Sequence, residues 1–403
     1  MKKTASGTPE AKNRNETDPL LREEPWRWWR TQMPVADRWA YFDHAAVSPL
    51  SGPAAAAARD FVGDASANGD YNWPQWAATS ERVREQFREL IHADSAEICL
   101  VPNTTSGVNL VAEGWPWTQG DNIILPEGEF PSNLFPWKNQ AVRGVEVRCV
   151  PRRGSEVMID DLLERIDAKT RMIAVSWVGY ASGFRIDLQR LVDEAHRRGV
   201  LVFLDAIQGL GIYPLDLRQT PVDFLAADGH KWLLGPEGLG VTMIRRPHLD
   251  RLRCGQVGWN SVKNAFNYSK PEFKLRDAAS RFEGGSANML GAAALSASLD
   301  LFLRVRTEHG SDAIAERILS LAEILESRLD ALGIKTRMSE KLEHRSGIVT
   351  FDLPGFDPGA FRKAALEKQV VLSCRDGGVR ASVHAYNDEA DLERLIRVVS
   401  DHL

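Results

Sequence analysis

The chain lacks the features that mark membrane, secreted and nucleic-acid-binding proteins. Its 403 residues contain no apolar run near the ~20 residues that a membrane span needs. The first residues are polar and charged, with no apolar segment behind them, so no signal peptide is expected. A net charge of −5 gives no general attraction to nucleic acid or to an anionic membrane. We therefore expect a cytoplasmic protein with neither nucleic-acid nor membrane partners.

Cysteine is also scarce. The four cysteines, Cys99, Cys149, Cys254 and Cys374, are far apart and show no disulfide or metal-binding spacing. This predicts reduced thiols and no metal centre. With 43% hydrophobic and 26% charged residues, the composition is typical of a globular protein. The length allows two domains and a large buried core.

The order of apolar segments predicts an α/β fold for the larger part of the chain. Helical periodicity occurs at residues 80–91, 106–113, 160–166 and 188–198, and short apolar runs that predict strands occur at 97–101, 122–125, 171–177, 200–204, 224–227 and 240–244. Strands that are apolar along nearly their whole length, separated by amphipathic helices, are typical of a mostly parallel sheet covered on both faces.

The pattern changes near residue 285. Helices are expected at 290–303, 313–332 and 389–403, and strands at 348–351, 370–373 and 379–382. We therefore expect an N-terminal arm over residues 1–40, a large domain over 41–285 and a small α+β domain over 286–403. The arm is expected to be partly disordered and to pack on the small domain. Its aromatic and basic stretch, residues 20–30, predicts a short helix docked on the body.

Three residues, in a particular order, indicate a cofactor site. Asp205 ends the apolar run 200–204, Gln208 follows three residues later, and Lys231 comes after the strand at 224–227. Ligands of doubly wound sheets bind at the carboxyl ends of strands. Pyridoxal phosphate needs a lysine amine for its Schiff base and a carboxylate beside its ring nitrogen. Gln208 can donate to the phenolic oxygen. The alternative interpretation is that Lys231 is an ordinary solvated lysine and that Asp205 belongs to a turn at the end of a strand. The occurrence of all three residues in this order favours the cofactor site.

A phosphate cradle is the expected role of the segment around Thr104 and Thr105. It follows a strand and opens a helix, where hydroxyls and free backbone N–H groups meet an anion. His230, next to Lys231, can add a donor. Ordinary helix capping and a structural histidine are the alternatives.

Two further segments are candidates for ligand contact. Ser286 follows a glycine pair at the expected domain junction, which suits close approach of the backbone to a ligand or to a neighbouring subunit. Arg380 lies in a late strand, where its planar guanidinium can hold a substrate carboxylate in a bidentate pair. A surface salt bridge is the alternative for Arg380.

These segments, in this order, resemble the class V aminotransferase family of fold type I pyridoxal phosphate enzymes. The family includes cysteine desulfurases, selenocysteine lyases, isopenicillin N epimerase and kynureninase. The resemblance runs from residues 41–50 to the final helix and is densest between residues 205 and 240. It implies a seven-stranded, mostly parallel sheet between helices, the cofactor pyridoxal 5'-phosphate, and a homodimer with its active site at the interface.

The resemblance also assigns roles to residues. It makes Lys231 the Schiff-base lysine, Asp205 the pyridinium partner and Gln208 the phenolate contact. It makes Thr104, Thr105 and His230, together with Ser286 of the partner subunit, the residues that bind the phosphate. It makes Arg380 the residue that binds the substrate carboxylate.

The chain departs from the desulfurase pattern at several positions. Phe130 falls where desulfurases and selenocysteine lyases place a ring-stacking histidine, and a phenyl ring stacks but cannot move protons. Tyr180 replaces a usual asparagine. Asp228 replaces a common serine, and its partner is either backbone or His230. Cys374 lies only five residues (375–379) before Arg380, so the long cysteine-bearing loop is absent. We expect Cys374 to be a packing residue, which argues against persulfide chemistry.

The expected substrate is an amino acid or amine, with Lys231 as general base. Transamination, epimerisation and β-elimination all remain open, and the departures resemble the isopenicillin N epimerase-like branch more closely. Tyr180 and His44, expected near the entrance, are candidate second acid–base groups, with packing roles as the alternative. A desulfurase or selenocysteine lyase-type β-lyase and a non-catalytic cofactor-binding protein are the competing interpretations.

Overall fold

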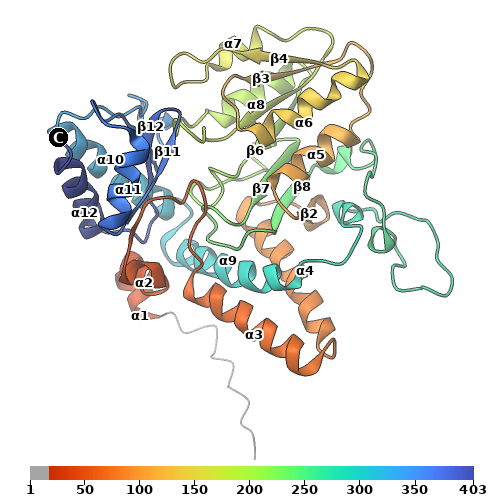
Figure 1. Cartoon of the computed structure of the whole chain (residues 1–403). Helices are drawn as coiled ribbons and strands as arrows, with labels where there is room; N and C mark the ends of the chain where they lie inside the picture. Colours follow the sequence, from red (N-terminus) through yellow and green to blue (C-terminus); the bar gives the residue numbers. More distant parts are fainter. Residues whose placement is uncertain (1–17) are drawn as a thin grey trace, which may run out of the picture.

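A computed structural model describes residues 18–403 of the chain (Figure 1). The part of the N-terminal arm that was predicted to be disordered lies outside the described residues. Within the described residues, no helix is both long and apolar enough to cross a membrane.

The centre of the molecule is a seven-stranded sheet. Its strands are β2 (Ile98–Val101), β3 (Asn122–Pro126), β4 (Glu146–Val150), β5 (Thr170–Ser176), β6 (Leu201–Asp205), β7 (Phe224–Asp228) and β8 (Gly240–Ile244), in the order β2-β8-β7-β6-β5-β3-β4. β8 is antiparallel to both of its neighbours, and every other neighbouring pair is parallel. The expected α/β fold with a mostly parallel sheet is confirmed.

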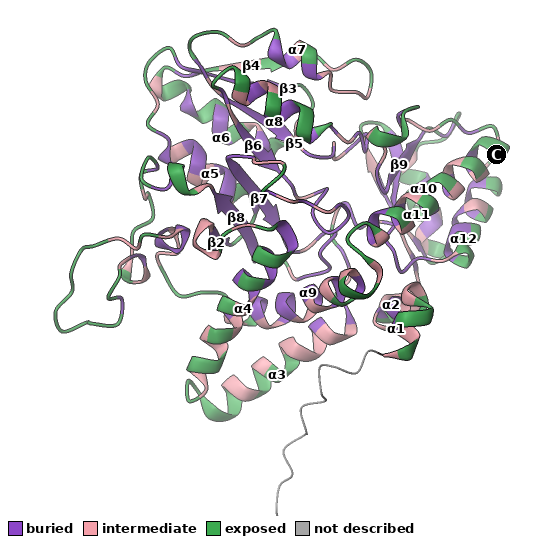
Figure 2. Cartoon of the chain, turned by 180° about the vertical axis from the view of Figure 1, so that it is seen from behind, coloured by how far each residue is buried: buried purple, intermediate pink, exposed green. Residues whose placement is uncertain are grey.

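Helices cover both faces of this sheet (Figures 1 and 2). They are α5 (Thr104–Gly114), α6 (Phe135–Lys138), α7 (Ile159–Leu163) and α8 (Leu188–Arg197). Because successive strand residues point to opposite faces, each strand supplies two cores. Ile173 and Val175 of β5 pack in the core that includes α8. Met172 and Ala174 pack in the core that includes α5.

A glycine allows α5 to lie directly on the sheet. A Cβ at Gly107 would come within 2.2 Å of Thr242 Oγ1 and 2.8 Å of Ala226 Cβ. These distances are too short for any side chain, so the first turn of α5 reaches its position above β7 and β8 only with glycine there.

The C-terminal part forms a second, smaller sheet with helices. It contains α9 (Met289–His309), α10 (Ala313–Ala331), β9 (Ile348–Phe351), α11 (Pro358–Glu367), β10 (Val370–Val371), β11 (Ser373–Arg375), β12 (Gly378–Ser382) and α12 (Glu389–Ser400). β11, β12 and β9 form an antiparallel sheet in that order. β10 pairs in parallel with β1 (Ala40–Tyr41), near the start of the described chain.

Helices α3 (Gly52–Asn68) and α4 (Trp73–Ile91) both pack against α9. α9, which begins the C-terminal part in sequence, therefore packs with helices from the first part of the chain. The domain boundary predicted near residue 285 stays a prediction. The expected short helix near the N-terminus is a pair, α1 (Pro19–Glu23) and α2 (Pro25–Thr31). Trp28 and Trp29 of α2 are buried, and Arg30 contacts Asp391 of α12 at 2.7 Å.

Candidate active site

The candidate site lies at the carboxyl edge of the central sheet. Ser176, Asp205 and Asp228 are the last residues of β5, β6 and β7, which are neighbouring parallel strands. Parallel strands end at the same edge, so the three side chains arrive together. Lys231 follows β7 on the next loop. Arg380, from β12 of the smaller sheet, approaches the same place.

Lys231 is a buried amine, with only 8% of its surface exposed. Its Nζ lies 5.6 Å from the centroid of the Phe130 ring. Among the described residues, no acceptor forms a hydrogen bond or ion pair with this amine. Burial lowers the pKa of Lys231 to about 8, and the charge of Arg380 adds to this against the opposing charge of Asp205. A larger fraction of this amine is therefore neutral, and able to act as a nucleophile or base, near neutral pH than for an ordinary lysine.

Asp205 is buried at 2% exposure and accepts a hydrogen bond from the backbone N–H of Ile207 at 3.1 Å. Burial raises its pKa to about 6, and both that hydrogen bond and the charge of Lys231 oppose the rise. A cationic partner stabilises the charged form of a buried carboxylate of this kind. A protonated ring nitrogen is such a partner.

Gln208 is held between two fixed groups. Its Nε2 donates to the carbonyl of Ala45 at 2.9 Å, and its Oε1 accepts from Nε1 of Trp232 at 2.7 Å. Trp232 is the neighbour of Lys231, so this contact fixes Gln208 relative to the lysine loop. One hydrogen of the Gln208 amide remains for another acceptor.

The first turn of α5 carries an unsatisfied hydroxyl. Asn103 caps the helix, and its Oδ1 accepts from the backbone N–H of Ser106 at 2.8 Å. The hydroxyl of Thr104 is buried and has no partner in the described part of the chain. The hydroxyl of Thr105 is exposed and donates to Ser132 at 2.7 Å. Free backbone N–H groups at a helix start, together with the Thr104 hydroxyl, are suited to an anion.

Asp228 faces His230, which decides between the two partners expected for this acid. Its Oδ1 lies 3.0 Å from Nδ1 of His230, a distance typical of an ion pair. Neither atom makes an aligned hydrogen bond. The pair is near Lys231, since the charge of Asp228 raises the pKa of that lysine.

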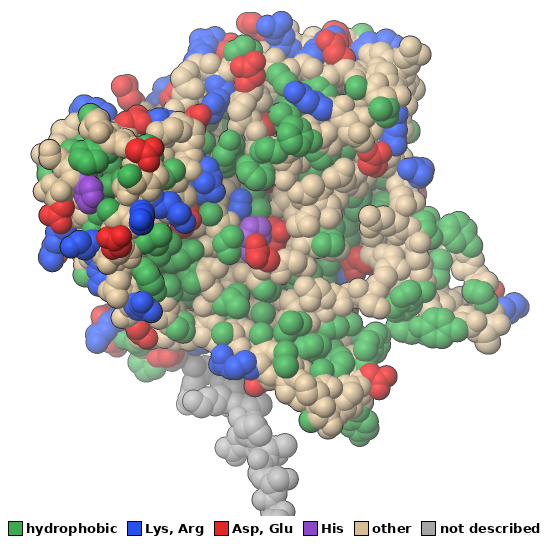
Figure 3. All heavy atoms as spheres, in the orientation of Figure 1, with side chains coloured by type: hydrophobic (Ala, Val, Ile, Leu, Met, Phe, Trp, Pro, Cys, Tyr) green, Lys and Arg blue, Asp and Glu red, His purple; other side chains and the backbone are tan. Residues whose placement is uncertain are grey.

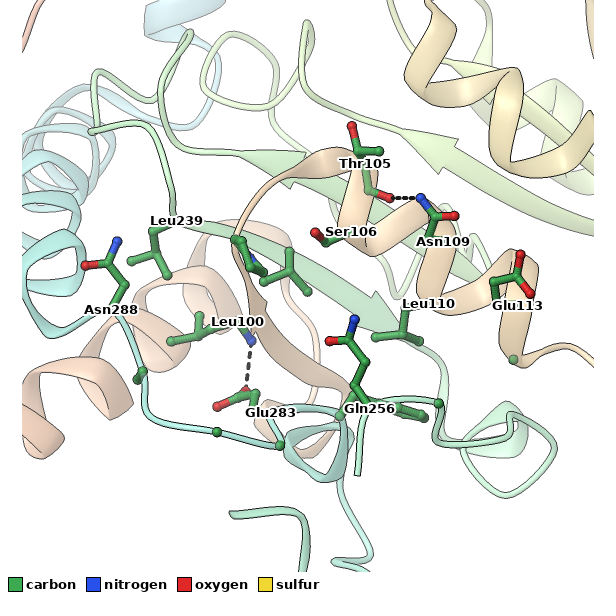
Figure 4. Close-up of a pocket in the computed structure, with 18 of the residues that line it drawn as sticks. Leu100, Thr105, Ser106, Asn109, Leu110, Glu113, Leu239, Gln256, Glu283 and Asn288 are labelled. Carbon is green, nitrogen blue, oxygen red and sulfur yellow. Dashed lines mark hydrogen bonds between the residues drawn. The ribbon is translucent and has the colours of Figure 1, made fainter. Parts of the chain in front are cut away.

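Ser286 and Thr105 line the same surface cavity of about 620 Å³ (Figure 4). The cavity lies between the first turns of α5, at Ser106 and Asn109, and the loop through Glu283 and residues 284–288. Lys231 and Asp205 do not line it. This cavity is therefore adjacent to the proposed phosphate cradle and separate from the amine.

Arg380 is completely buried, which excludes the surface salt bridge considered for it. Nε donates to Ser373 Oγ at 3.1 Å, Nη1 to the carbonyl of Tyr180 at 2.7 Å, and Nη2 contacts Asp43 Oδ1 at 3.3 Å. Burial lowers its pKa to about 10, and Asp43 opposes that change. Three of its five N–H groups are used, and the two that remain are enough for one carboxylate.

One aromatic ring lies beside the amine and contacts a second ring. Phe130 and Tyr180 meet edge to face, with ring centroids 5.2 Å apart and planes at 74°. Phe130 is 40% exposed, so one part of its ring is free to cover a ligand.

His44 is not at the entrance of the site, so the prediction that placed it there is wrong. It is completely buried. Its Nδ1 lies 2.8 Å from the carbonyl of Ser382, and its Nε2 lies 2.8 Å from the hydroxyl of Tyr386. Burial lowers the pKa of His44 to about 4. Its ring also packs 6.0 Å from the ring of Trp232, so His44 has the packing and hydrogen-bonding role that was the alternative for it.

Cys374 faces away from the candidate site. Its Sγ contacts the carbonyl of Pro358 on α11 at 3.0 Å, and burial raises the pKa of its thiol. The chain passes from β11 to β12 through Asp376 and Gly377, both with positive φ, 51° and 75°. A two-residue turn of this type closes the hairpin tightly. The cysteine-bearing loop is absent, as the spacing predicted.

Glu129 was missed at the sequence level. Its carboxylate accepts hydrogen bonds from the backbone N–H of Ser176, at 2.7 Å, and from the Ser176 hydroxyl, at 2.5 Å. Ser176 is the strand partner of Asp205. Burial raises the pKa of Glu129 to about 7, and the charge of Asp205 adds to the rise. An acid shortly after the strand at 122–125 was the available signal.

The chain is similar to known proteins over most of its length. The sequence model of the family described as "Aminotransferase class-V" matches residues 40–395. A protein of Methanothermobacter thermautotrophicus named "Probable cysteine desulfurase" is 28% identical over 389 residues, which are 91% of this chain and 95% of the relative.

Solved structures are similar as well. A cysteine desulfurase from Thermococcus onnurineus superposes with a TM-score of 0.84 and 25% identity, covering 93% of this chain and 96% of the other. A variant of the protein C-DES, with glycine covalently linked to its PLP cofactor, has a TM-score of 0.87 and 23% identity, covering 93% and 99%.

Proposed function

The chain belongs to the class V aminotransferase family, and from this premise we propose that it transforms an amino acid or amine with pyridoxal phosphate bound at Lys231. The protein has the fold of the type I pyridoxal phosphate enzymes. Its cofactor is pyridoxal 5'-phosphate, on which this family depends.

The unsatisfied groups of the site match the groups of this cofactor. The Lys231 amine is buried without an acceptor, and it would hold the cofactor through the aldehyde carbon. The Thr104 hydroxyl is buried without a partner beside a helix start, where a phosphate supplies acceptors. The buried amine is the observation that carries the proposal.

When bound, the cofactor supplies an aldehyde for the substrate amine and a ring that withdraws electrons from Cα. Asp205 would hold a proton on the ring nitrogen, and Gln208 would donate to the phenolic oxygen. Phe130 would cover one face of the ring. Thr104, Thr105 and His230 would hold the phosphate.

Arg380 would orient the substrate by its carboxylate. Burial makes that contact strong, since water does not compete for the guanidinium. Lys231 would take the proton from Cα, a role that suits an amine whose pKa is lowered to about 8. Tyr180 is the remaining candidate for a second proton donor, because Phe130 has no proton to give and both ring nitrogens of the buried His44 are engaged.

We favour transamination or epimerisation over persulfide chemistry. A desulfurase that forms a persulfide on its own cysteine needs a thiol facing the substrate, and Cys374 faces α11. The second candidate is a β-lyase that works without a protein thiol. The names of similar proteins, which are cysteine desulfurases, favour it.

We also propose that the chain forms a homodimer, with Ser286 acting in the partner's site. Support comes from the protruding loop after β8, where Trp259, Phe266 and Tyr268 are exposed at 37%, 60% and 68% (Figure 3). Such a group of exposed aromatic side chains is typical of an interface.

Product analysis with a panel of L- and D-amino acids tests the function. An oxo acid indicates transamination, the opposite enantiomer indicates epimerisation, and ammonia with an oxo acid and a released β-substituent indicates elimination. If no amino acid changes the cofactor spectrum or yields a product, the protein is a non-catalytic binder and the proposal fails.

A further inference from the structure

A second arginine faces the candidate site from the same hairpin as Arg380. Ser373 lies directly opposite Arg380 in the β11–β12 pair, and Arg375 lies opposite Gly378. Side chains two residues apart on a strand share a face, and directly opposed residues do too. Arg375 is therefore on the face that carries Ser373 and Arg380, and Cys374 is on the other.

The charge of Arg375 reaches the site. It contributes to lowering the pKa of Lys231, and it does the same for Arg380. Arg375 is partly exposed, so its guanidinium is accessible to solvent.

This guanidinium has no acidic partner. Among the described residues, its hydrogen-bond partner is the carbonyl of the preceding residue, Cys374, to which Nη1 donates at 2.8 Å. No carboxylate of residues 18–403 lies within ion-pair distance of it, whereas Arg380 has Asp43 and Arg337 has Asp352. A cation without a counter-ion, on the strand face that carries Arg380, is available to an anionic ligand.

Another basic side chain is nearby. Arg152 follows β4 and lies against Gly128, where a Cβ would come within 2.5 Å of its guanidinium carbon. Its nearest acid, Asp376 in the β11–β12 turn, is 3.9 Å away. Arg152 thus places a second weakly neutralised charge between the Phe130 loop and the hairpin.

We propose that Arg375 is a second anion subsite and that the substrate is an α-amino acid whose side chain ends in a carboxylate. This rests on the proposed function, in which Arg380 takes the α-carboxylate. Because the contacts of Arg380 leave it room for one carboxylate, a distal carboxylate needs a separate cation. Arg375, two residues from Ser373 on the same face, meets that need.

The test compares acids with their amides on the holoenzyme. L-Glutamate, L-aspartate, L-glutamine and L-asparagine are titrated while the visible absorption of the bound cofactor is recorded. A charge-assisted contact contributes about 10- to 100-fold in affinity, so the acids should bind that much more tightly than the amides. Arg375→Ala should remove the difference, and Arg375→Lys should restore part of it.

Lys363→Ala is the matched control, because Lys363 is exposed on α11 of the same region. It removes one positive charge and should leave the preference intact. Equal affinity of the wild-type protein for acids and amides overturns the inference alone, whether or not the variants fold. No spectral response to any amino acid overturns the proposed function itself.

Discussion

Nε of Arg380 donates to Oγ of Ser373 at 3.1 Å, across the β11–β12 pair. This contact fixes which face of the hairpin looks toward Lys231. The residue after Ser373 must point the other way, and Cys374 does so, toward Pro358. The hairpin thereby presents arginines to the site and keeps its thiol away from it.

Replacing Cys374 with alanine should leave catalysis nearly unchanged. The thiol is on the far face of β11 and burial raises its pKa, so it is a poor nucleophile. We expect the rate of amino-acid conversion to stay within about twofold, and stability to fall by no more than ~1–2 kcal/mol for the lost packing. A loss of sulfur release in the variant, measured as sulfide from L-cysteine, would support the desulfurase interpretation instead.

Uptake of the cofactor by the apoenzyme should depend on pH through Lys231. Only the neutral amine reacts with an aldehyde, and burial lowers its pKa to about 8. The uptake rate should rise about tenfold from pH 6 to pH 7 and level off above about pH 9. Stopped-flow absorption measures it.

Asp205→Asn tests the direction in which a neighbouring charge shifts this pH profile. The charge of Asp205 raises the pKa of Lys231, so its removal should move the midpoint to lower pH. A midpoint near the ordinary lysine pKa of 10.5 in the wild-type protein would mean that burial does not lower the pKa of Lys231.

Thr104→Val should weaken binding of the phosphorylated cofactor without lowering stability. The hydroxyl is buried with no partner, so its loss costs the apoprotein no hydrogen bond. We expect the Kd for pyridoxal phosphate to rise about 10-fold, and the Kd for pyridoxal, which has no phosphate, to stay the same. Fluorescence titration with both compounds separates a phosphate contact from a general defect. Thr105→Val is the variant to compare with Thr104→Val, because the Thr105 hydroxyl, unlike that of Thr104, already donates a hydrogen bond to Ser132.

Asp223 stabilises the fold at a distance from the site. Its carboxylate contacts Nε2 of His196 at 2.8 Å and Nε2 of His248 at 2.7 Å, and accepts from the backbone N–H of Val202 at 2.8 Å. Although burial opposes the change, these partners lower the pKa of Asp223 to about 2. Since the pKa is lower in the folded state, its stabilisation is present above about pH 4 and disappears as pH falls toward about 2.

The corresponding variant is Asp223→Asn. It should lower the free energy of unfolding by ~2–4 kcal/mol at pH 7, and the difference from wild type should shrink as the pH falls from 4 to 2. Urea denaturation at several pH values measures this. A difference that does not depend on pH would mean that packing, rather than charge, is responsible.

Local sequence patterns were enough to predict most of the sheet and the order of Asp205, Gln208 and Lys231. Each of these residues follows an apolar strand, and parallel strands place such residues at one edge. The alanine-rich segment of α3 gave little amphipathic signal, and charged residues alternate in the edge strand β4, so both were missed.

The rest of the site depends on contacts between distant segments. His44 is buried because β12 and the loop after it close over it, which residues near position 44 do not encode. The role of Arg375 depends on strand register, and the neighbour of Glu129 is a serine 47 positions later. The structure brings Lys231, Asp205, Phe130, Tyr180 and Arg380 together, and their roles stay predictions.

The most direct test of the central claim is the visible absorption spectrum of the purified protein with pyridoxal phosphate. Cofactor bound to Lys231 should give a visible band that is absent in Lys231→Ala and retained in Lys363→Ala. Wild-type protein that shows no such band after reconstitution, or a Lys231→Ala variant that keeps the band, would contradict that claim.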